Sequence, residues 1–148
     1  MGNRAVITTE DNFNNNGIGI YLHWNGGYDS VNAFLKYAKL KGIRGCESDP
    51  SYFWARFCQV IGNYFGGTLS LGIDTIDKLG CDFCDNGVYL INDDFEIVGR
   101  KYYSGEEQNN YDLKEMLHDI NNAQKDNDRL PKENIDNEIV KHENEYFV

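Results

Sequence analysis

The spacing of apolar positions near the N-terminus predicts two strands. Residues 4–9 ("RAVITT") and 18–24 ("IGIYLHW") are rich in β-branched and aromatic residues, and the polar segment "EDNFNNNG" between them has the composition of a turn. Two strands joined by a short polar segment commonly pair with each other. We therefore expect an antiparallel hairpin at the start of the chain.

The period of the apolar positions changes to that of a helix over residues 29–41. Four apolar residues fall at i, i+3, i+4 and i+7 and form one stripe: Val31, Phe34, Leu35 and Ala38. Lysines gather toward the C-terminal end of this segment, where cations suit the helix dipole, and Gly42 follows. The pattern predicts an amphipathic helix that stops at Gly42.

A second helix is predicted to begin with Asp49 as its N-cap and Pro50 as its first residue, and to end at Gly66 and Gly67. Its segment "SYFWARFCQVIGNYF" is apolar on most sides. Such a helix is expected to be buried, either in the core of one subunit or at a contact between subunits.

The rest of the body adds three predicted strands and one helix. The segment "TLSLGI" is a strand, "VYLINDDFEIVGRKYY" is a hairpin that turns at Asn92, Asp93 and Asp94, and residues 112–122 form an amphipathic helix. The predicted order is β-β-α-α-β-β-β-α. It indicates an α+β fold in which an antiparallel sheet is packed with two or three helices in a single domain.

The composition changes after residue 123. The segment 124–148 is polar, charged and rich in Asn, which is typical of a flexible tail. Ile135, Ile139 and Tyr146 could instead form a short amphipathic helix that docks on the body. We therefore divide the chain into an α+β domain, residues 1–123, and an acidic polar tail, residues 124–148.

Net charge narrows the range of partners. The formal net charge is −10; residues 1–105 hold 9 basic and 12 acidic residues, a net of −3, and residues 106–148 hold 5 and 12, a net of −7. A nucleic-acid backbone is bound by basic surface, so no nucleic-acid partner is expected.

No export signal is evident in the sequence, and no apolar run approaches the roughly 20 residues of a membrane span. We therefore expect a cytoplasmic protein without a membrane partner.

Candidate catalytic groups are scattered along the sequence. His23, His118 and His142 lie far apart, and no nucleophile-elbow, phosphate-loop or zinc-protease motif is present. The single C-x-x-C, "CDFC" at 81–84, lacks a second pair for a zinc site, so the four cysteines are interpreted as reduced thiols. We therefore expect no enzymatic activity, no metal and no cofactor.

Features of a binding site are easier to find. Aromatic residues make up 14% of the chain, and a nucleobase that stacks on such a ring gains about 1–3 kcal/mol. Arg56 lies inside the aromatic helix, where it faces solvent, a carboxylate or an anionic ligand, and Arg100 lies late in the last hairpin. A salt bridge to one of the abundant carboxylates is the alternative for either arginine.

The turn at Gly26 and Gly27 lacks the spacing of known phosphate loops and is interpreted as a structural connection.

Five blocks of sequence together resemble a known family. They are "GNRAVIT", "IYLHWNGG", "SVNAFLKYAK", "ARFCQVIGNYFGGTLSLGI" and "DNGVYLIND", and they lie within residues 1–122. The pattern is similar to that of the Thoeris anti-defence proteins of the first-described type, which are encoded by phages and prophages. None of these blocks carries a catalytic signature.

The resemblance implies a molecular sponge. Proteins of that family bind the cyclic ADP-ribose isomer made by TIR-domain defence enzymes and hold it without cleaving it, and some also bind cyclic oligonucleotides. They are α+β homo-oligomers whose ligand pockets lie at contacts between protomers. Residues 1–123 would then be the ligand-binding domain, acting in the cytoplasm of an infected or lysogenic bacterium.

The resemblance also implies a set of site residues. Phe83 would stack on adenine, Asn92 would hydrogen-bond to ribose or base, and Arg100 or Arg56 would pair with the pyrophosphate, with Trp24 as a further candidate. The alternative function is an acidic interaction protein, of the anti-CRISPR or nucleic-acid-mimic kind, that inhibits a defence nuclease. The concentration of acidic residues in the tail argues against a mimic, which needs ordered carboxylates on a folded face.

Overall fold

A five-stranded sheet forms the centre of the molecule in the computed structural model, which describes residues 2–67, 69–82, 85–103 and 111–146, with the side chains of residues 140–146 excepted. The strand order is β3-β2-β1-β4-β5. The strands are β1 (Ala5–Thr8), β2 (Ile18–Leu22), β3 (Leu71–Thr75), β4 (Val88–Ile91) and β5 (Ile97–Lys101). The predicted α+β class in one domain is confirmed.

The pairing of β1 with β4 departs from the expected all-antiparallel sheet. The β1–β2 and β4–β5 pairs are antiparallel, as predicted for the two hairpins, and β2–β3 is antiparallel as well. β1 and β4 run parallel, with Val6 opposite Val88. A parallel pair needs a long crossover connection. Here the chain between β1 and β4 contains three α-helices and two further strands, β2 and β3, and local sequence patterns do not reveal that such distant strands pair.

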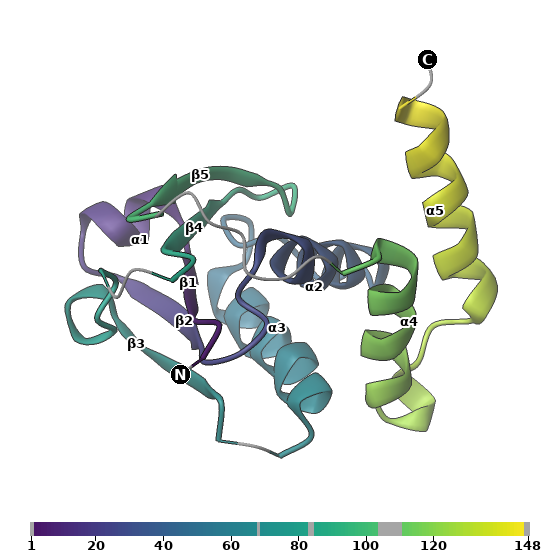
Figure 1. Cartoon of the computed structure of the whole chain (residues 1–148), viewed down its shortest axis with the longest axis horizontal. Coiled ribbons are helices and arrows are strands. Elements are labelled where there is room, and N and C mark those ends of the chain that lie inside the picture. Colours follow the sequence, from purple (N-terminus) through teal and green to yellow (C-terminus); the bar gives the residue numbers. More distant parts are fainter. Residues whose placement is uncertain (1, 68, 83–84, 104–110, 147–148) are drawn as a thin grey trace.

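The described residues form five α-helices, more than the two or three expected. They are α1 (Glu10–Asn14), α2 (Tyr28–Leu40), α3 (Pro50–Phe65), α4 (Leu113–Ala123) and α5 (Lys132–Tyr146), and short 3₁₀ turns lie at Ile76–Lys78 and Asp126–Asp128. Figure 1 shows α2 and α3 beside the sheet, α4 next to them and α5 outermost. None of the described helices combines the length and apolar character that a membrane crossing requires.

The segment between β1 and β2 contains the helix α1 and is not the simple turn expected from its sequence. The Thr9 hydroxyl oxygen accepts a hydrogen bond from the Asn12 N–H (3.1 Å), and Glu10 and Asp11 occupy the first turn, where acidic residues suit the helix dipole. These capping features outweigh the turn-like composition of "EDNFNNNG".

Alternation along the strands divides the core between the two faces of the sheet. Ala5 and Ile7 of β1 lie in the larger cluster, together with the buried side chains of α2 and α3. Val6 lies in a smaller cluster on the opposite face, which is covered by Phe13 of α1 and by Ile76. Both faces of the central strands are therefore buried, which explains why β1 and β4 are continuous apolar runs.

The connection between α4 and α5 is fixed to the body by two buried amides. The Gln124 amide donates to the carbonyl oxygens of Val60 (3.1 Å) and Ile120 (3.0 Å). The Asn121 side-chain oxygen accepts from the Tyr37 hydroxyl (2.6 Å) and from the Leu130 N–H (2.8 Å). The start of the predicted tail is thus part of the packed structure and positions one wall of the pocket described next.

Candidate functional site

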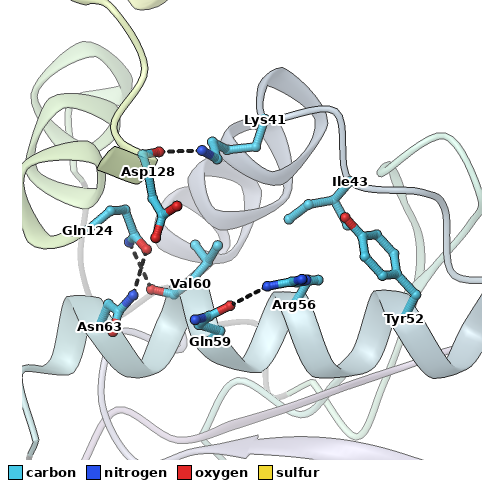
Figure 2. Close-up of a pocket in the computed structure, with 9 residues that line it drawn as sticks. All are labelled: Lys41, Ile43, Tyr52, Arg56, Gln59, Val60, Asn63, Gln124 and Asp128. Carbon is cyan, nitrogen blue, oxygen red and sulfur yellow. Dashed lines mark hydrogen bonds between the residues drawn. The ribbon is translucent and has the colours of Figure 1, made fainter. Parts of the chain in front are cut away.

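A pocket of about 290 Å³ lies between α3, the end of α2 and the α4–α5 connection (Figure 2). Its nine lining residues come from these three places: Lys41, Ile43, Tyr52, Arg56, Gln59, Val60, Asn63, Gln124 and Asp128. The volume lies at the lower end of the range for small-ligand sites. Polar side chains dominate its rim, and Ile43 and Val60 form buried apolar parts of the wall.

One face of α3 supplies most of this lining. Tyr52, Arg56, Gln59 and Asn63 are spaced by four, three and four residues, which places them along one side of a helix. The opposite side buries aromatic rings such as Phe53 and Phe57 in the core. Because the core fixes the rotation of α3, the polar stripe has a defined orientation toward the pocket.

Two cationic side chains reach the pocket from different elements. Lys41, which follows α2, donates to the backbone carbonyl of Asp128 across the opening. Arg56 on α3 donates to the Gln59 side-chain oxygen (3.1 Å). One carboxylate, that of Asp128, also lines the pocket, so the formal charge of the lining is +1 in a chain whose net charge is −10.

The Tyr52 ring lies beside two guanidinium groups. The Arg56 guanidinium carbon is 5.4 Å from the ring centroid and that of Arg44 is 5.0 Å away. Arg44 is held in turn by Asp49, the N-cap of α3, at 2.8 Å. Cation–π contacts of this kind order the arginines around the ring and concentrate positive charge at this end of the pocket.

The lining offers groups that can bind an anionic ligand. Lys41 and Arg56 can donate to an anion, Tyr52 offers a ring surface, and Asp128 can accept from hydroxyl groups. No His, Cys, Ser or Thr is among the nine described lining residues, so they supply no imidazole and none of the usual thiol or hydroxyl nucleophiles.

Arg100 lies elsewhere, over the ring of Tyr89, whose hydroxyl contacts the Gly26–Gly27 turn. Its guanidinium carbon is 4.4 Å from the Tyr89 ring centroid and 3.5 Å from that of Tyr103, and one nitrogen donates to the Asn86 carbonyl (2.9 Å). The Tyr89 hydroxyl donates to the Gly26 carbonyl (2.7 Å). Arg100 therefore takes part in a structural cluster that joins β5 to β4 and to the loop before it.

The Gly26–Gly27 turn is held closely against the N-terminal segment. The Gly26 N–H donates to the Asn3 carbonyl (2.8 Å), and a Cβ at Gly26 would lie 2.5 Å from that same oxygen. Only glycine fits such an approach. The turn therefore has the structural role expected for it.

Asn92 caps the β4–β5 turn. Its side-chain oxygen accepts from the N–H groups of Asp94 and Glu96 (3.0 Å each), and its amide donates to the Glu96 carboxylate (3.0 Å). These bonds use both ends of the side chain within the turn. The structure gives Asn92 a local structural role.

The two aromatic candidates lie outside the pocket of Figure 2 or outside the described residues. Trp24 follows β2, is 46% exposed, and packs edge-on against His23 with ring centroids 5.0 Å apart. Phe83 lies outside the described residues. Of the four predicted site residues that the structure describes, only Arg56 lines the pocket of Figure 2.

Lys41, Tyr52 and Gln59 are residues of the pocket that sequence reasoning missed. The polar positions 52, 56, 59 and 63 on an otherwise apolar helix were the available signal for α3. Lys41 was assigned only to the C-terminal end of its helix. Its place beside the α4–α5 connection depends on tertiary packing.

The cysteines that the structure describes are free thiols. Burial, with smaller contributions from Glu47 and Asp93, raises the pKa of Cys46 to about 11, and burial also raises the pKa of Cys58 and Cys81. Cys84 lies outside the described residues, so the C-x-x-C pair is not described as a unit. Within the described part of the chain, no group of three or more His, Cys, Asp or Glu side chains could hold a metal ion.

Two other arginines of the body form salt bridges. Arg4 pairs with Asp85 at 2.7 Å, and Arg44 with Asp49 at 2.8 Å.

Comparison with known proteins identifies no relative of this chain. No family model, curated protein or solved structure matches it.

Proposed function

We propose that this protein binds and sequesters a small nucleotide signal, a cyclic ADP-ribose isomer, without cleaving it. The proposal combines the resemblance to Thoeris anti-defence proteins with the pocket of Figure 2. The observation that carries it is a pocket in a strongly acidic chain that is lined by two cations, Lys41 and Arg56, and by the Tyr52 ring next to Arg56.

Electrostatics support an anionic ligand at this position. An acidic protein repels anions over most of its surface, so cations that gather locally mark a place where an anion can be held. Lys41 and Arg56 come from separate elements and could donate to the two phosphates of a pyrophosphate. Residues 106–148 hold 12 acidic residues; Asp128 of this segment lines the pocket, and salt screens those that lie more than about 10 Å away.

The other groups of the pocket support a nucleoside. Tyr52 offers a ring on which adenine can stack, worth about 1–3 kcal/mol. The Asp128 carboxylate and the Gln59 amide can hydrogen-bond to ribose hydroxyls. The nine lining residues include no His, Cys, Ser or Thr, which is compatible with retention of an intact ligand.

Isothermal titration of the purified protein with TIR-derived cyclic ADP-ribose isomers tests the proposal. Linear ADP-ribose and NAD serve as controls, and the ligand is recovered afterwards by heating the protein. We expect tight binding of a cyclic isomer and recovery of that isomer unchanged. Absence of heat with every isomer, or recovery of a cleaved product, would contradict the proposal.

An acidic inhibitor of a defence nuclease is the function left if no isomer binds. Deleting residues 124–148 is a poor test of that function because Gln124 is 4% exposed and Ile135 is fully buried. Asp126 and Glu133 are both exposed, and the Asp126 carboxylate pairs only with the exposed Arg129 side chain among the ion pairs of the described residues, so we expect the fold to tolerate their neutralisation. A nuclease captured by the wild type and lost with D126N/E133Q would favour the inhibitor, whereas ligand binding by the same variant would favour the sponge.

A further inference from the structure

We propose that Asp128 makes the pocket of Figure 2 selective by charge, so that it binds a nucleotide whose pyrophosphate is esterified at both ends in preference to nucleotides with a terminal phosphate, such as ATP. This inference rests on the proposed function and adds to it which nucleotides the pocket excludes. It is carried by the Asp128 carboxylate, which lies in the lining with the cations Lys41 and Arg56.

The Asp128 carboxylate lines the pocket without a hydrogen-bond or ion-pair partner among the described residues. Figure 2 shows it directed into the pocket, toward Gln124 and Val60. The hydrogen bonds of this residue are made by its backbone: the carbonyl accepts from Lys41, and the N–H donates to the Lys125 carbonyl (2.8 Å). An ionised carboxylate can accept hydrogen bonds from ligand hydroxyl groups, and it disfavours a second negative charge nearby.

The turn that carries Asp128 is held on both sides. Before it, the buried Gln124 amide donates to two backbone carbonyls, at 3.1 and 3.0 Å. After it, the Leu130 N–H donates to the Asn121 side-chain oxygen (2.8 Å). Together with the bond from Lys41, these contacts keep the Asp128 carboxylate at the pocket, so a bound ligand lies beside this negative charge.

The negative charge of Asp128 already acts on a neighbouring group. Burial raises the pKa of the Tyr37 hydroxyl to about 12, and the Asp128 carboxylate adds to this rise, while Arg129 opposes it. The carboxylate therefore makes a second negative charge near it less favourable. A phosphate that enters the same space is subject to the same repulsion.

The charges of the lining suit a dianionic ligand better than a more highly charged one. Lys41 and Arg56 are positive and Asp128 is negative, and the described lining holds no third cation. A pyrophosphate esterified at both ends carries one negative charge on each phosphate, which the two cations can balance, and the attached ribose hydroxyls can donate to Asp128. The terminal phosphate of ATP adds negative charge that no cation of the described lining balances and that Asp128 repels.

Titration of the protein with the cyclic ADP-ribose isomer and with ATP, at physiological ionic strength and without divalent cations, tests this inference. The wild type should bind the isomer more tightly than ATP. Asp128→Asn removes the negative charge and keeps the shape of the side chain. It should gain roughly fivefold or more in affinity for ATP relative to the isomer, because ATP carries the greater negative charge.

Two further variants show whether the effect belongs to the charge at this position. Asp126→Asn is the matched control, since it makes the same charge change on the same turn, but Asp126 pairs with Arg129 (3.0 Å) and does not line the pocket. This variant should bind ATP and the isomer as the wild type does. Asp128→Glu keeps the negative charge and should keep the preference for the isomer.

The outcomes separate this inference from the proposed function. The inference is overturned, and the proposed function stands, if the wild type binds the isomer but binds ATP as tightly, or if Asp126→Asn changes the preference as much as Asp128→Asn. A folded Asp128→Asn protein, checked by its urea midpoint, that gains no affinity for ATP also overturns it. If no isomer binds but Asp128→Asn gains affinity for ATP, the proposed function is wrong and the exclusion of terminal phosphates by Asp128 is retained.

Discussion

Asp93 illustrates, at the scale of single residues, how a turn holds a neighbouring loop. One of its carboxylate oxygens accepts from the N–H groups of Glu47 and Ser48, at 2.8 Å each. A Cβ at Gly45 would lie 2.2 Å from the same oxygen, so the loop needs glycine there. Hydrogen bonds from the Ser48 hydroxyl, the Ser48 N–H and the Glu47 N–H lower the pKa of Asp93.

The lowered pKa predicts how Asp93 contributes to stability as the pH changes. Since the folded pKa lies below the unfolded value, the contribution is present above the ordinary pKa of an aspartate and is lost as pH falls through the folded value. Asp93→Asn should therefore lower the urea midpoint at pH 7, and the difference from wild type should shrink below about pH 4. Asp94→Asn, at the exposed next position, is the control. An equal difference at pH 7 and pH 3 would contradict this role.

Asn92 separates a structural role from a ligand-binding one. Asn92→Ala removes the acceptor of two N–H groups in the turn and should cost about 1 kcal/mol of unfolding free energy. If the ligand site is the pocket of Figure 2, nucleotide affinity should stay within about twofold, as titration of the folded variant can show. A loss of more than tenfold in affinity would place the site at the hairpin, as the family resemblance implied.

At the scale of elements, local signals in the sequence predicted most helices and strands. At the start of α3, Asp49 accepts a hydrogen bond from the Tyr52 N–H, and at its end Gly66 adopts a left-handed backbone conformation. Both ends were predicted because each depends on residues within a few positions of the helix terminus. The α2 stripe and the β4–β5 hairpin are equally local. The parallel pairing of β1 with β4 and the pocket beside α3 join distant segments, so no nearby pattern predicted them.

Helix α5 was the element most difficult to predict from the composition of the sequence. Its segment is polar enough to be read as a flexible tail, yet Ile135 is fully buried, and His118 of α4 lies 2.9 Å from Asp136. Ile135 and the partly buried Ile139 pack against the core and, together with the His118–Asp136 contact, anchor the described part of this helix. Average polarity therefore underestimated the order of the segment.

Removing the Ile135 side chain should reveal how strongly α5 is docked. Ile135→Ala leaves a cavity against α4 and should cost about 2–4 kcal/mol of unfolding free energy, measured by urea denaturation. Asn134→Ala, at the exposed neighbouring position, should change stability by less than about 0.5 kcal/mol. Equal stability of both variants would indicate that α5 contributes little to the folded body.

At the scale of the whole molecule, a strongly acidic chain contains a pocket whose lining has a net positive charge. The chain has a net charge of −10, while Lys41 and Arg56 line one pocket together with Tyr52, and Arg44 lies beside the Tyr52 ring. This arrangement suits a protein that admits one anionic ligand at a defined place. From its composition the chain was expected to have no nucleic-acid partner. That Lys41 and Arg56 line the same pocket follows from the packing of α2, α3 and the α4–α5 connection and was not predictable from composition.

The most direct test of this account is isothermal titration of four proteins with the same TIR-derived cyclic ADP-ribose isomer: wild type, Arg56→Gln, Tyr52→Leu and the control Lys39→Gln. Lys39 is exposed on α2 and does not line the pocket, so its loss matches the charge change of Arg56→Gln. We predict roughly tenfold or greater loss of affinity for the Arg56 and Tyr52 variants and wild-type affinity for Lys39→Gln. Wild-type affinity in all three folded variants would contradict the assignment of this pocket as the nucleotide site.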